Sequence, residues 1–174
     1  MAAAKMKIAV DICNTLVDIN SEIEKMGYRR TPGVYFFNNL PSKLFKENLE
    51  IFERAKPFYG AEDALWRLSE VYDIVYLTAR PIEAAEVTKK SLFEINNFPP
   101  GKIVHSYCKV HDFKKEGCIF AIDDAPEEIS EYLKSGIRCY IHHRDYNGRF
   151  AGPRIIDWSG VAKECERKEV VSYA

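Results

Sequence analysis

Short apolar runs alternate with segments of helical spacing along most of the chain. Apolar residues dominate 7–12, 73–78 and 118–122, and each run is short and bounded by polar residues, as in strands buried on both faces. In 61–70 the apolar residues recur three and four positions apart, which is typical of an amphipathic helix. The alternation predicts right-handed βαβ crossovers and a three-layer, Rossmann-like parallel sheet of the α/β class.

Proline and glycine positions predict the remaining elements. Pro81 favours the start of a helix that runs to about Ile95, and Pro126 favours a helix that ends near Lys134, before Gly136. Further short strands are expected at 103–104, 138–141 and 155–156, and a final helix at 157–168.

The stretch 20–57 interrupts the alternation. It spans 38 residues, which is too long for an ordinary connection between a strand and a helix. It carries an aromatic cluster at 35–37 and a segment, 41–54, that is predicted to be one helix. We therefore expect a core domain made of 6–19 and 58–174, and a small helical insertion at 20–57 that lies over the strand ends as a cap.

Composition limits the classes of function. The net charge of -1 argues against a binder of nucleic-acid polymers, which normally carries a basic excess. No apolar run approaches the ~18 residues of a membrane span, so no membrane association is expected. The five cysteines include no C-x-x-C pair and no zinc-binding spacing, which favours a reducing, cytoplasmic location.

Oxygen-bearing side chains stand at the ends of three predicted strands. They are Asp11, Thr78 and the pair Asp123 and Asp124. The carboxyl ends of parallel strands meet at one edge of a sheet, where ligands bind. Carboxylates that close together cannot all ionise without compensation, and Mg²⁺ prefers oxygen ligands. With a lysine and a threonine nearby, such an edge could hold a phosphate group, and an aspartate there could attack phosphorus.

Four motifs in order resemble those of the haloacid dehalogenase (HAD) superfamily of phosphotransferases. The first motif of that family, Asp-x-Asp-x-Thr, reads Asp11-Ile12-Cys13-Asn14-Thr15 here. Thr78 resembles the second motif, and the acidic pair at 123–124 the fourth. The third motif is a lysine upstream of that pair; Lys109 has the expected spacing, and Lys102 and Lys114 are further candidates.

Within the superfamily, the chain is similar to the 5′(3′)-deoxyribonucleotidase-like branch. The similarity lies in 77–81 (Leu-Thr-Ala-Arg-Pro), in 122–126 (Ile-Asp-Asp-Ala-Pro), and in Tyr146-Asn147 followed by Asp157-Trp158. That branch has a small helical cap after the first motif, as expected here for 20–57.

The resemblance implies a Mg²⁺-dependent phosphomonoester hydrolase that acts through an aspartyl-phosphate on a small phosphorylated metabolite or a nucleotide. The implied catalytic residues are Asp11, Cys13, Thr78 and Lys109. The implied substrate contacts are Thr78, Ala79, Arg80 and Lys109, and the implied metal ligands are Asp11, Cys13 (through its main chain), Asp123 and Asp124.

One position departs from the family pattern. Phosphatases of the family carry an aspartate, which resembles a general acid/base, where this chain has Cys13. Loss of such a group typically costs ~10²–10⁴-fold in rate. Metal binding is therefore expected to survive while turnover is impaired, and the alternative function is a non-hydrolytic HAD-like protein that binds phosphate or metal.

Two further alternatives fit the chain less well. A phosphoacceptor receiver domain places its acidic pair after the first strand, whereas here the pair comes late in the chain, at 123–124. Dehalogenation needs no metal, and the acidic pair suggests one.

Overall fold

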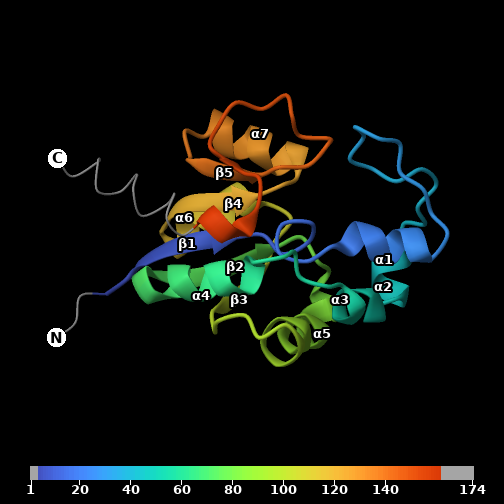
Figure 1. Cartoon of the computed structure of the whole chain (residues 1–174), viewed down its shortest axis with the longest axis horizontal. Coiled ribbons are helices and arrows are strands. Elements are labelled where there is room, and N and C mark those ends of the chain that lie inside the picture. Colours follow the sequence, from blue (N-terminus) through green and yellow to red (C-terminus); the bar gives the residue numbers. More distant parts are fainter. Residues whose placement is uncertain (1–3, 162–174) are drawn as a thin grey trace.

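The computed structural model describes residues 4–161, which form a six-stranded parallel sheet between helices (Figure 1). The strand order is β3-β2-β1-β4-β5-β6, so β1, β2 and β4 are neighbours at the centre. The strands are β1 Met6–Val10, β2 Tyr72–Thr78, β3 Lys102–His105, β4 Cys118–Asp123, β5 Cys139–His142 and β6 Arg154–Ile155.

Successive side chains of the central strands enter two different cores. Ile74 and Tyr76 of β2 belong to one apolar cluster, and Val75 and Leu77 to the other. The first cluster includes Leu65 and Leu68 of α4 (Ala61–Val71). The second includes residues of α6 (Lys109–Glu116) and α7 (Pro126–Lys134), namely Phe113, Ile129 and Tyr132. The predicted three-layer α/β fold is therefore confirmed.

The insertion contributes three short helices: α1 Ile19–Lys25, α2 Leu44–Glu47 and α3 Glu50–Arg54. The prediction of one helix over 41–54 is wrong, because the chain leaves helical geometry at Asn48 (φ -130°, ψ 59°). The Asn48 side chain donates to the Leu44 carbonyl (3.1 Å), and such local bonds compete with a continuing helix. Figure 1 shows α1, α2 and α3 grouped with α5 at one end of the molecule.

The helical stretch after Pro81 changes geometry along its length. It comprises the 3₁₀ turn η1 Ile82–Ala84, the helix α5 Ala85–Lys90 and a π-helical segment η2 Ser91–Ile95. Of the final helix predicted at 157–168, the described part is a 3₁₀ turn, η3 Trp158–Gly160, and 162–168 lie outside the described residues. The indole of Trp158 donates to the Thr15 carbonyl (3.1 Å), so this turn supports the loop after β1.

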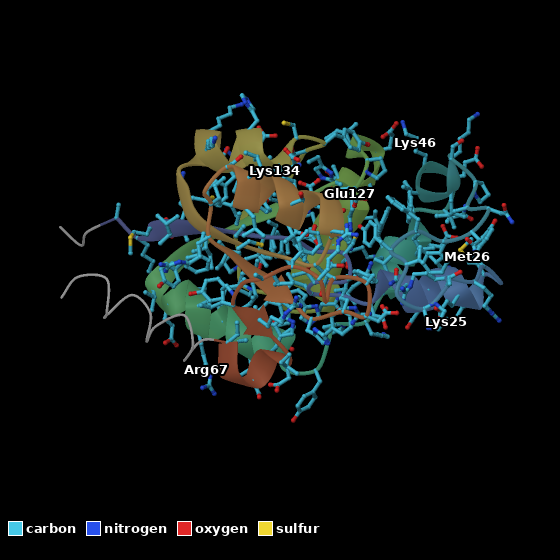
Figure 2. All side chains as sticks on the ribbon, turned by 90° about the horizontal axis from the view of Figure 1, so that it is seen from above. Lys25, Met26, Lys46, Arg67, Glu127 and Lys134 are labelled. Atoms are coloured by element: carbon cyan, nitrogen blue, oxygen red, sulfur yellow. The ribbon has the colours of Figure 1, made fainter. Side chains whose placement is uncertain are left out.

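Viewed from above, the insertion forms one end of the molecule. Figure 2 shows Lys25, Met26 and Lys46 there, whereas Lys134 of α7 and Arg67 of α4 lie on opposite sides of the sheet. None of the helices among residues 4–161 has the length and apolar character needed to cross a membrane.

Gly101, at the start of β3, has no room for a side chain. A Cβ there would lie 2.5 Å from the Ile74 carbonyl oxygen and 2.9 Å from the Tyr76 ring, which a bond to the Pro99 carbonyl (2.7 Å) holds in place. We expect Gly101→Ala to lower the free energy of unfolding by about 1–3 kcal/mol in urea titrations. Gly148→Ala is the control, because a Cβ there meets open space. Equal stability of the two variants would contradict the packing described.

Candidate active site

A tight turn after β1 presents Asp11 at the edge of the sheet. The Asp11 amide donates to the Ile122 carbonyl (2.9 Å). The amides of Leu16 and Val17 both donate to the Ile12 carbonyl, which closes the turn. The turn requires Asn14 to adopt φ 60°, a left-handed conformation that asparagine tolerates better than most residues. The loop therefore directs Asp11 toward the strands beside β1.

Three carboxylates meet at this edge. Asp11, Asp123 and Asp124 each offer an oxygen within 4.8 Å of the others. Their exposed fractions are 6%, 1% and 1%, so water screens them poorly. The structure thus brings together the acids that the sequence placed at the ends of β1 and β4.

Lys109 supplies the positive charge between two of these carboxylates. Its Nζ donates to Asp11 Oδ1 (2.6 Å) and to Asp123 Oδ2 (2.8 Å), and the residue is 2% exposed. Burial by itself would lower the pKa of Lys109, but the two carboxylates outweigh it and raise that pKa well above its usual value. Of the other candidate lysines, Lys102 pairs with Glu116 (2.6 Å) and Lys114 is exposed.

Asp123 and Asp124 have different surroundings. Burial raises the pKa of Asp123 to about 7, against the opposing effect of Lys109. Burial and the neighbouring carboxylates also raise the pKa of Asp124. Asp124 accepts bonds from the hydroxyls of Thr15 (2.8 Å to Oδ1) and Tyr146 (to Oδ2). Thr15 and Tyr146 stood out in the sequence only as parts of motifs, without a role.

The donor set suits a hard divalent cation. Three carboxylates face one ammonium group, so the buried cluster lacks positive charge when the acids are ionised. Oxygen ligands are those that Mg²⁺ prefers. Both oxygens of Asp124 accept hydroxyl hydrogen bonds, and those of Asp123 accept from Lys109 and from the Ala125 amide, whereas only Oδ1 of Asp11 accepts a hydrogen bond from a side chain of the described residues.

The segment after β2 lines the site only in part. Ala79 and Arg80 line the cavity described below. Thr78 is fully buried; its hydroxyl accepts from the Arg80 amide (3.3 Å) and its carbonyl from the Ser106 amide (2.8 Å). Among residues 4–161, no hydrogen bond joins Thr78 to Asp11 or Lys109.

The Cys13 thiol accepts a hydrogen bond from an arginine. Arg80 Nε donates to Cys13 Sγ (3.2 Å). Burial raises the pKa of the thiol, with Arg80 opposing that effect, so the thiol stays protonated at neutral pH. A protonated thiol is a poor base, in line with the concern that the sequence raises about Cys13.

A cavity of about 270 Å³ opens over these groups. Asp11, Cys13 and Lys109 line one part of it. Five aromatic residues of the insertion line another part, Tyr35, Phe36, Phe37, Phe45 and Phe52, and α7 adds Glu127 and Glu128. The cavity can therefore hold a charged group beside Asp11 and an apolar or planar group among the rings.

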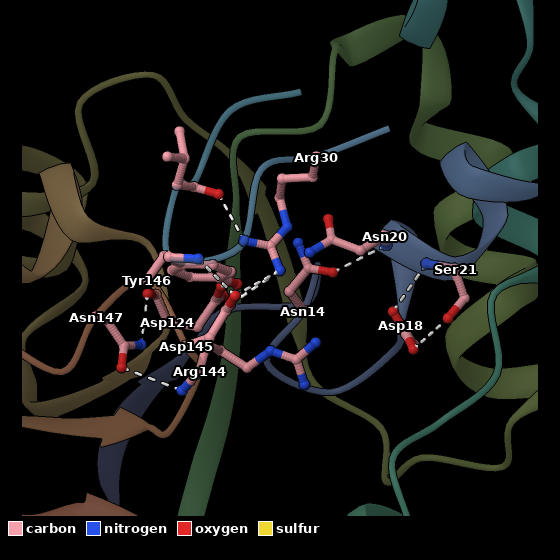
Figure 3. Close-up of polar contacts among 12 residues, drawn as sticks. Asn14, Asp18, Asn20, Ser21, Arg30, Asp124, Arg144, Asp145, Tyr146 and Asn147 are labelled. Atoms are coloured by element: carbon pink, nitrogen blue, oxygen red, sulfur yellow. Dashed lines mark hydrogen bonds and ion pairs between the residues drawn. The ribbon is translucent and has the colours of Figure 1, made fainter. Parts of the chain in front are cut away.

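An ion pair ties the insertion to the loop after β5. Arg30 Nη2 lies 2.9 Å from Asp145 Oδ1, and its guanidinium lies over the Tyr146 ring, 5.0 Å from the centroid. Tyr35 meets the same ring edge-on at 5.1 Å. Figure 3 shows Arg30 beside Asp145 and Tyr146, close to Asp124. The part of the insertion that carries Arg30 and Tyr35 is thus packed against Tyr146, whose hydroxyl donates to Asp124.

His142, at the end of β5, supports the turn after β1. Its Nδ1 lies 2.8 Å from the Asn14 carbonyl oxygen, and its ring lies between Phe58 and Trp158, 4.9 and 5.8 Å from their centroids. Burial lowers the pKa of His142 to about 4. The folded protein therefore holds this imidazole neutral.

Comparisons with known proteins give one curated relative and several solved structures. No protein-family model matches the sequence. A Bacillus cereus protein named "Putative nucleotidase" is 27% identical over 159 residues, which span 88% of this chain and 80% of that protein.

The solved structures have low identity but similar folds. A haloacid dehalogenase-like family hydrolase from Xanthomonas campestris has a TM-score of 0.62 at 11% identity, over 95% of this chain and 96% of that one. CbbY from Rhodobacter sphaeroides, solved with phosphate, has a TM-score of 0.56 at 13% identity, over 90% of this chain and 96% of that one. L-2-haloacid dehalogenase from Xanthobacter autotrophicus has a TM-score of 0.62 at 7% identity, over 93% of this chain and 98% of that one. At these identities the likeness shows a shared fold.

Removing the Lys109 ammonium should leave Asp11 and Asp123 facing each other without compensation. We expect Lys109→Met to lower the free energy of unfolding by about 3–5 kcal/mol at pH 7, as for other broken buried pairs. Added Mg²⁺ should restore more stability to this variant than to the wild type. The control is Lys102→Met, because the Lys102 side chain is exposed and its pair with Glu116 contributes only about 1 kcal/mol. Equal losses would contradict this description of the site.

His142 should make the protein less stable in acid. Its pKa falls from ~6.5 in the unfolded chain to about 4 in the fold. The stability that depends on a neutral His142 is therefore fully present above pH 6.5 and is lost as the pH falls toward 4. Urea titrations give the free energy of unfolding at pH 7.5 and at pH 4.5. The decrease between these two pH values should be about 2 kcal/mol smaller in His142→Gln than in the wild type. The exposed neighbour is the control: His143→Gln should keep the full decrease. An unchanged decrease in His142→Gln refutes the assignment.

Proposed function

We propose that this chain, whose fold is that of the haloacid dehalogenase-like hydrolases, is a Mg²⁺-dependent hydrolase of phosphomonoesters. The observation that supports this most is the contact of Lys109 with both Asp11 and Asp123, within a buried cluster of three carboxylates. A nucleophile and a fixed cation, Asp11 and Lys109, then line one cavity, and the further hard oxygen ligands of the cluster lie beside them, as phosphoryl transfer requires.

In the proposed first step, Asp11 attacks phosphorus. Lys109 donates to Asp11 Oδ1 and so orients the carboxylate, and the second carboxylate oxygen forms the new bond. The bond from phosphorus to the leaving oxygen breaks, which gives an aspartyl-phosphate. When bound, Mg²⁺ supplies positive charge to the phosphoryl oxygens, and Asp11, Asp123 and the main chain of Cys13 would hold it, with Asp124 in support.

In the second step, water restores the Asp11 carboxylate. The water oxygen bonds to phosphorus as the bond to Asp11 breaks; one water proton leaves on the inorganic phosphate and the other passes to solvent. Lys109, Ala79 and Arg80 are in place to contact phosphoryl oxygens along the cavity wall, and Thr78 shapes the segment that carries the last two.

The cavity also bears on the substrate. The insertion, 20–57, contributes five aromatic rings, which can stack on a planar group such as a nucleobase. The name of the Bacillus cereus relative favours a nucleotide, and a small phosphorylated metabolite is the broader class. We propose 6–19 with 58–174 as the core domain and 20–57 as the cap, and a cytoplasmic location in keeping with the free Cys13, Cys108, Cys118 and Cys139.

The alternative, a non-hydrolytic protein that binds phosphate or metal, is favoured by one observation. Cys13 has a protonated thiol that is hydrogen-bonded to Arg80, and it offers no carboxylate to activate water. Such a protein would bind Mg²⁺ and phosphate in the same cavity without turnover.

A panel of phosphomonoesters, nucleotides among them, assayed with and without Mg²⁺ tests the proposal. We expect Mg²⁺-dependent release of phosphate, and a loss of at least ~10³-fold in Asp11→Asn, because the amide is not a nucleophile. Cys13→Asp, which restores the general acid/base of the family pattern, should raise turnover by ~10²-fold or more. Binding of Mg²⁺ and phosphate without turnover in either protein would favour the non-hydrolytic alternative.

A further inference from the structure

Arg80 is a buried cation without a carboxylate partner. It is 3% exposed, and among residues 4–161 no ion pair joins it to an acid. Its guanidinium lies over the Phe52 ring, 4.5 Å from the centroid. A charge that is buried in this way is costly unless something compensates it, so an anionic group that binds beside Arg80 would be stabilised by it.

The donors of Arg80 are only partly used. Nε donates to Cys13 Sγ (3.2 Å) and Nη1 to Thr88 Oγ1 (3.3 Å), which fixes the plane of the guanidinium. Nη2 is buried and has no hydrogen-bond partner among the described residues. Arg80 lines the same cavity as Asp11, so an anionic ligand there lies close to the guanidinium charge, while Nη2 itself is enclosed by the protein.

The position of Arg80 relates it to the leaving group. In an in-line displacement the leaving oxygen departs on the side opposite the attacking oxygen, here away from Asp11 and into the remainder of the cavity. Cys13, Arg80 and the rings of the insertion also line the cavity, and Arg80 donates to Cys13, which stands where the family pattern has the general acid that serves the leaving oxygen. A guanidinium does not release its proton at neutral pH, but a fixed cation stabilises an oxygen that carries negative charge.

We propose that Arg80 stabilises the leaving oxygen as an anion, so that the site prefers phosphoryl groups bound to weakly basic oxygens. Such oxygens are those of phenols, of carboxylates and of a second phosphate, in contrast to alkyl alcohols, which include the sugar hydroxyl that a nucleoside monophosphate releases. A nucleotide substrate would therefore lose a phosphoryl group that is bound to a second phosphate. The proposal rests on the proposed hydrolase function. In this step the Asp11 oxygen bonds to phosphorus, the bond to the leaving oxygen breaks and its electron pair stays on that oxygen; no proton moves, and Arg80 remains charged.

A series of substituted phenyl phosphates, with ethyl phosphate as the alkyl member, tests this in the full chain with Mg²⁺. We expect kcat/KM to fall steeply as the leaving group becomes more basic, with ethyl phosphate at least ~100-fold below 4-nitrophenyl phosphate. Arg80→Gln should steepen the dependence, with a loss about tenfold larger for phenyl phosphate than for 2,4-dinitrophenyl phosphate. Arg80→Lys keeps the charge, so its leaving-group dependence should lie between those of the wild type and Arg80→Gln. Arg67→Gln on α4 should leave the wild-type dependence unchanged.

Each other outcome overturns the inference. An equal loss across the series in Arg80→Gln would mean that Arg80 only supports Cys13 and Thr88. A shallow wild-type dependence that becomes steep in Glu128→Gln would make Glu128, which also lines the cavity, the proton donor. If Arg80→Gln does not fold, Arg80→Lys decides, and an equal loss across the series in that variant also overturns the inference. Absence of turnover on every compound would instead refute the hydrolase function itself.

Discussion

The Lys109 ammonium lies between the carboxylates of Asp11 and Asp123, and the candidate site is arranged around this contact. Buried charges are tolerated only when they are paired and hydrogen-bonded. One ammonium cannot balance three acids, however, even though the hydroxyls of Thr15 and Tyr146 hold Asp124. Burial raises the pKa of Asp123 to about 7, and the charge of Asp11 adds to that effect while Lys109 opposes it. A divalent cation would balance the acids without protonating them, which is why we connect the cluster with Mg²⁺ and with phosphoryl transfer.

The rest of the fold serves to hold that contact and to cover it. The central strands β1 and β4 end side by side and deliver the acids, while the first turn of α6 delivers Lys109. The insertion adds an apolar cavity wall, fastened through Arg30 and Asp145 to the loop that carries Tyr146. The Cys13–Arg80 contact places a fixed positive charge in the cavity wall, beside the position where the family pattern has a carboxylate. In the mechanism that we propose, attack on phosphorus and departure of the leaving group depend on different residues, Asp11 and Arg80.

Local signals in the sequence were sufficient for the fold and for the acids. Apolar runs that end in aspartate predicted β1 and β4, and Pro126 predicted the start of α7 where the structure has it. The break at Asn48 was missed, because a side-chain bond to the Leu44 carbonyl ends a helix that the apolar spacing would continue. The partners of Asp124 and Cys13 could not be predicted either: Thr15 is 109 residues from Asp124, and Cys13 is 67 residues from Arg80. Such contacts arise from the packing of distant elements, which periodicity does not encode.

The central claim, that Asp11 and Asp123 share a divalent cation beside Lys109, is tested most directly by diffraction from crystals soaked in Mn²⁺. Mn²⁺ accepts the oxygen ligands that suit Mg²⁺ and gives an anomalous signal. The account predicts one strong anomalous peak at ligand distance, ~2.0–2.3 Å, from a carboxylate oxygen of each of these two residues. A well-ordered site with no peak there, or with Mn²⁺ bound elsewhere in the molecule, would contradict it.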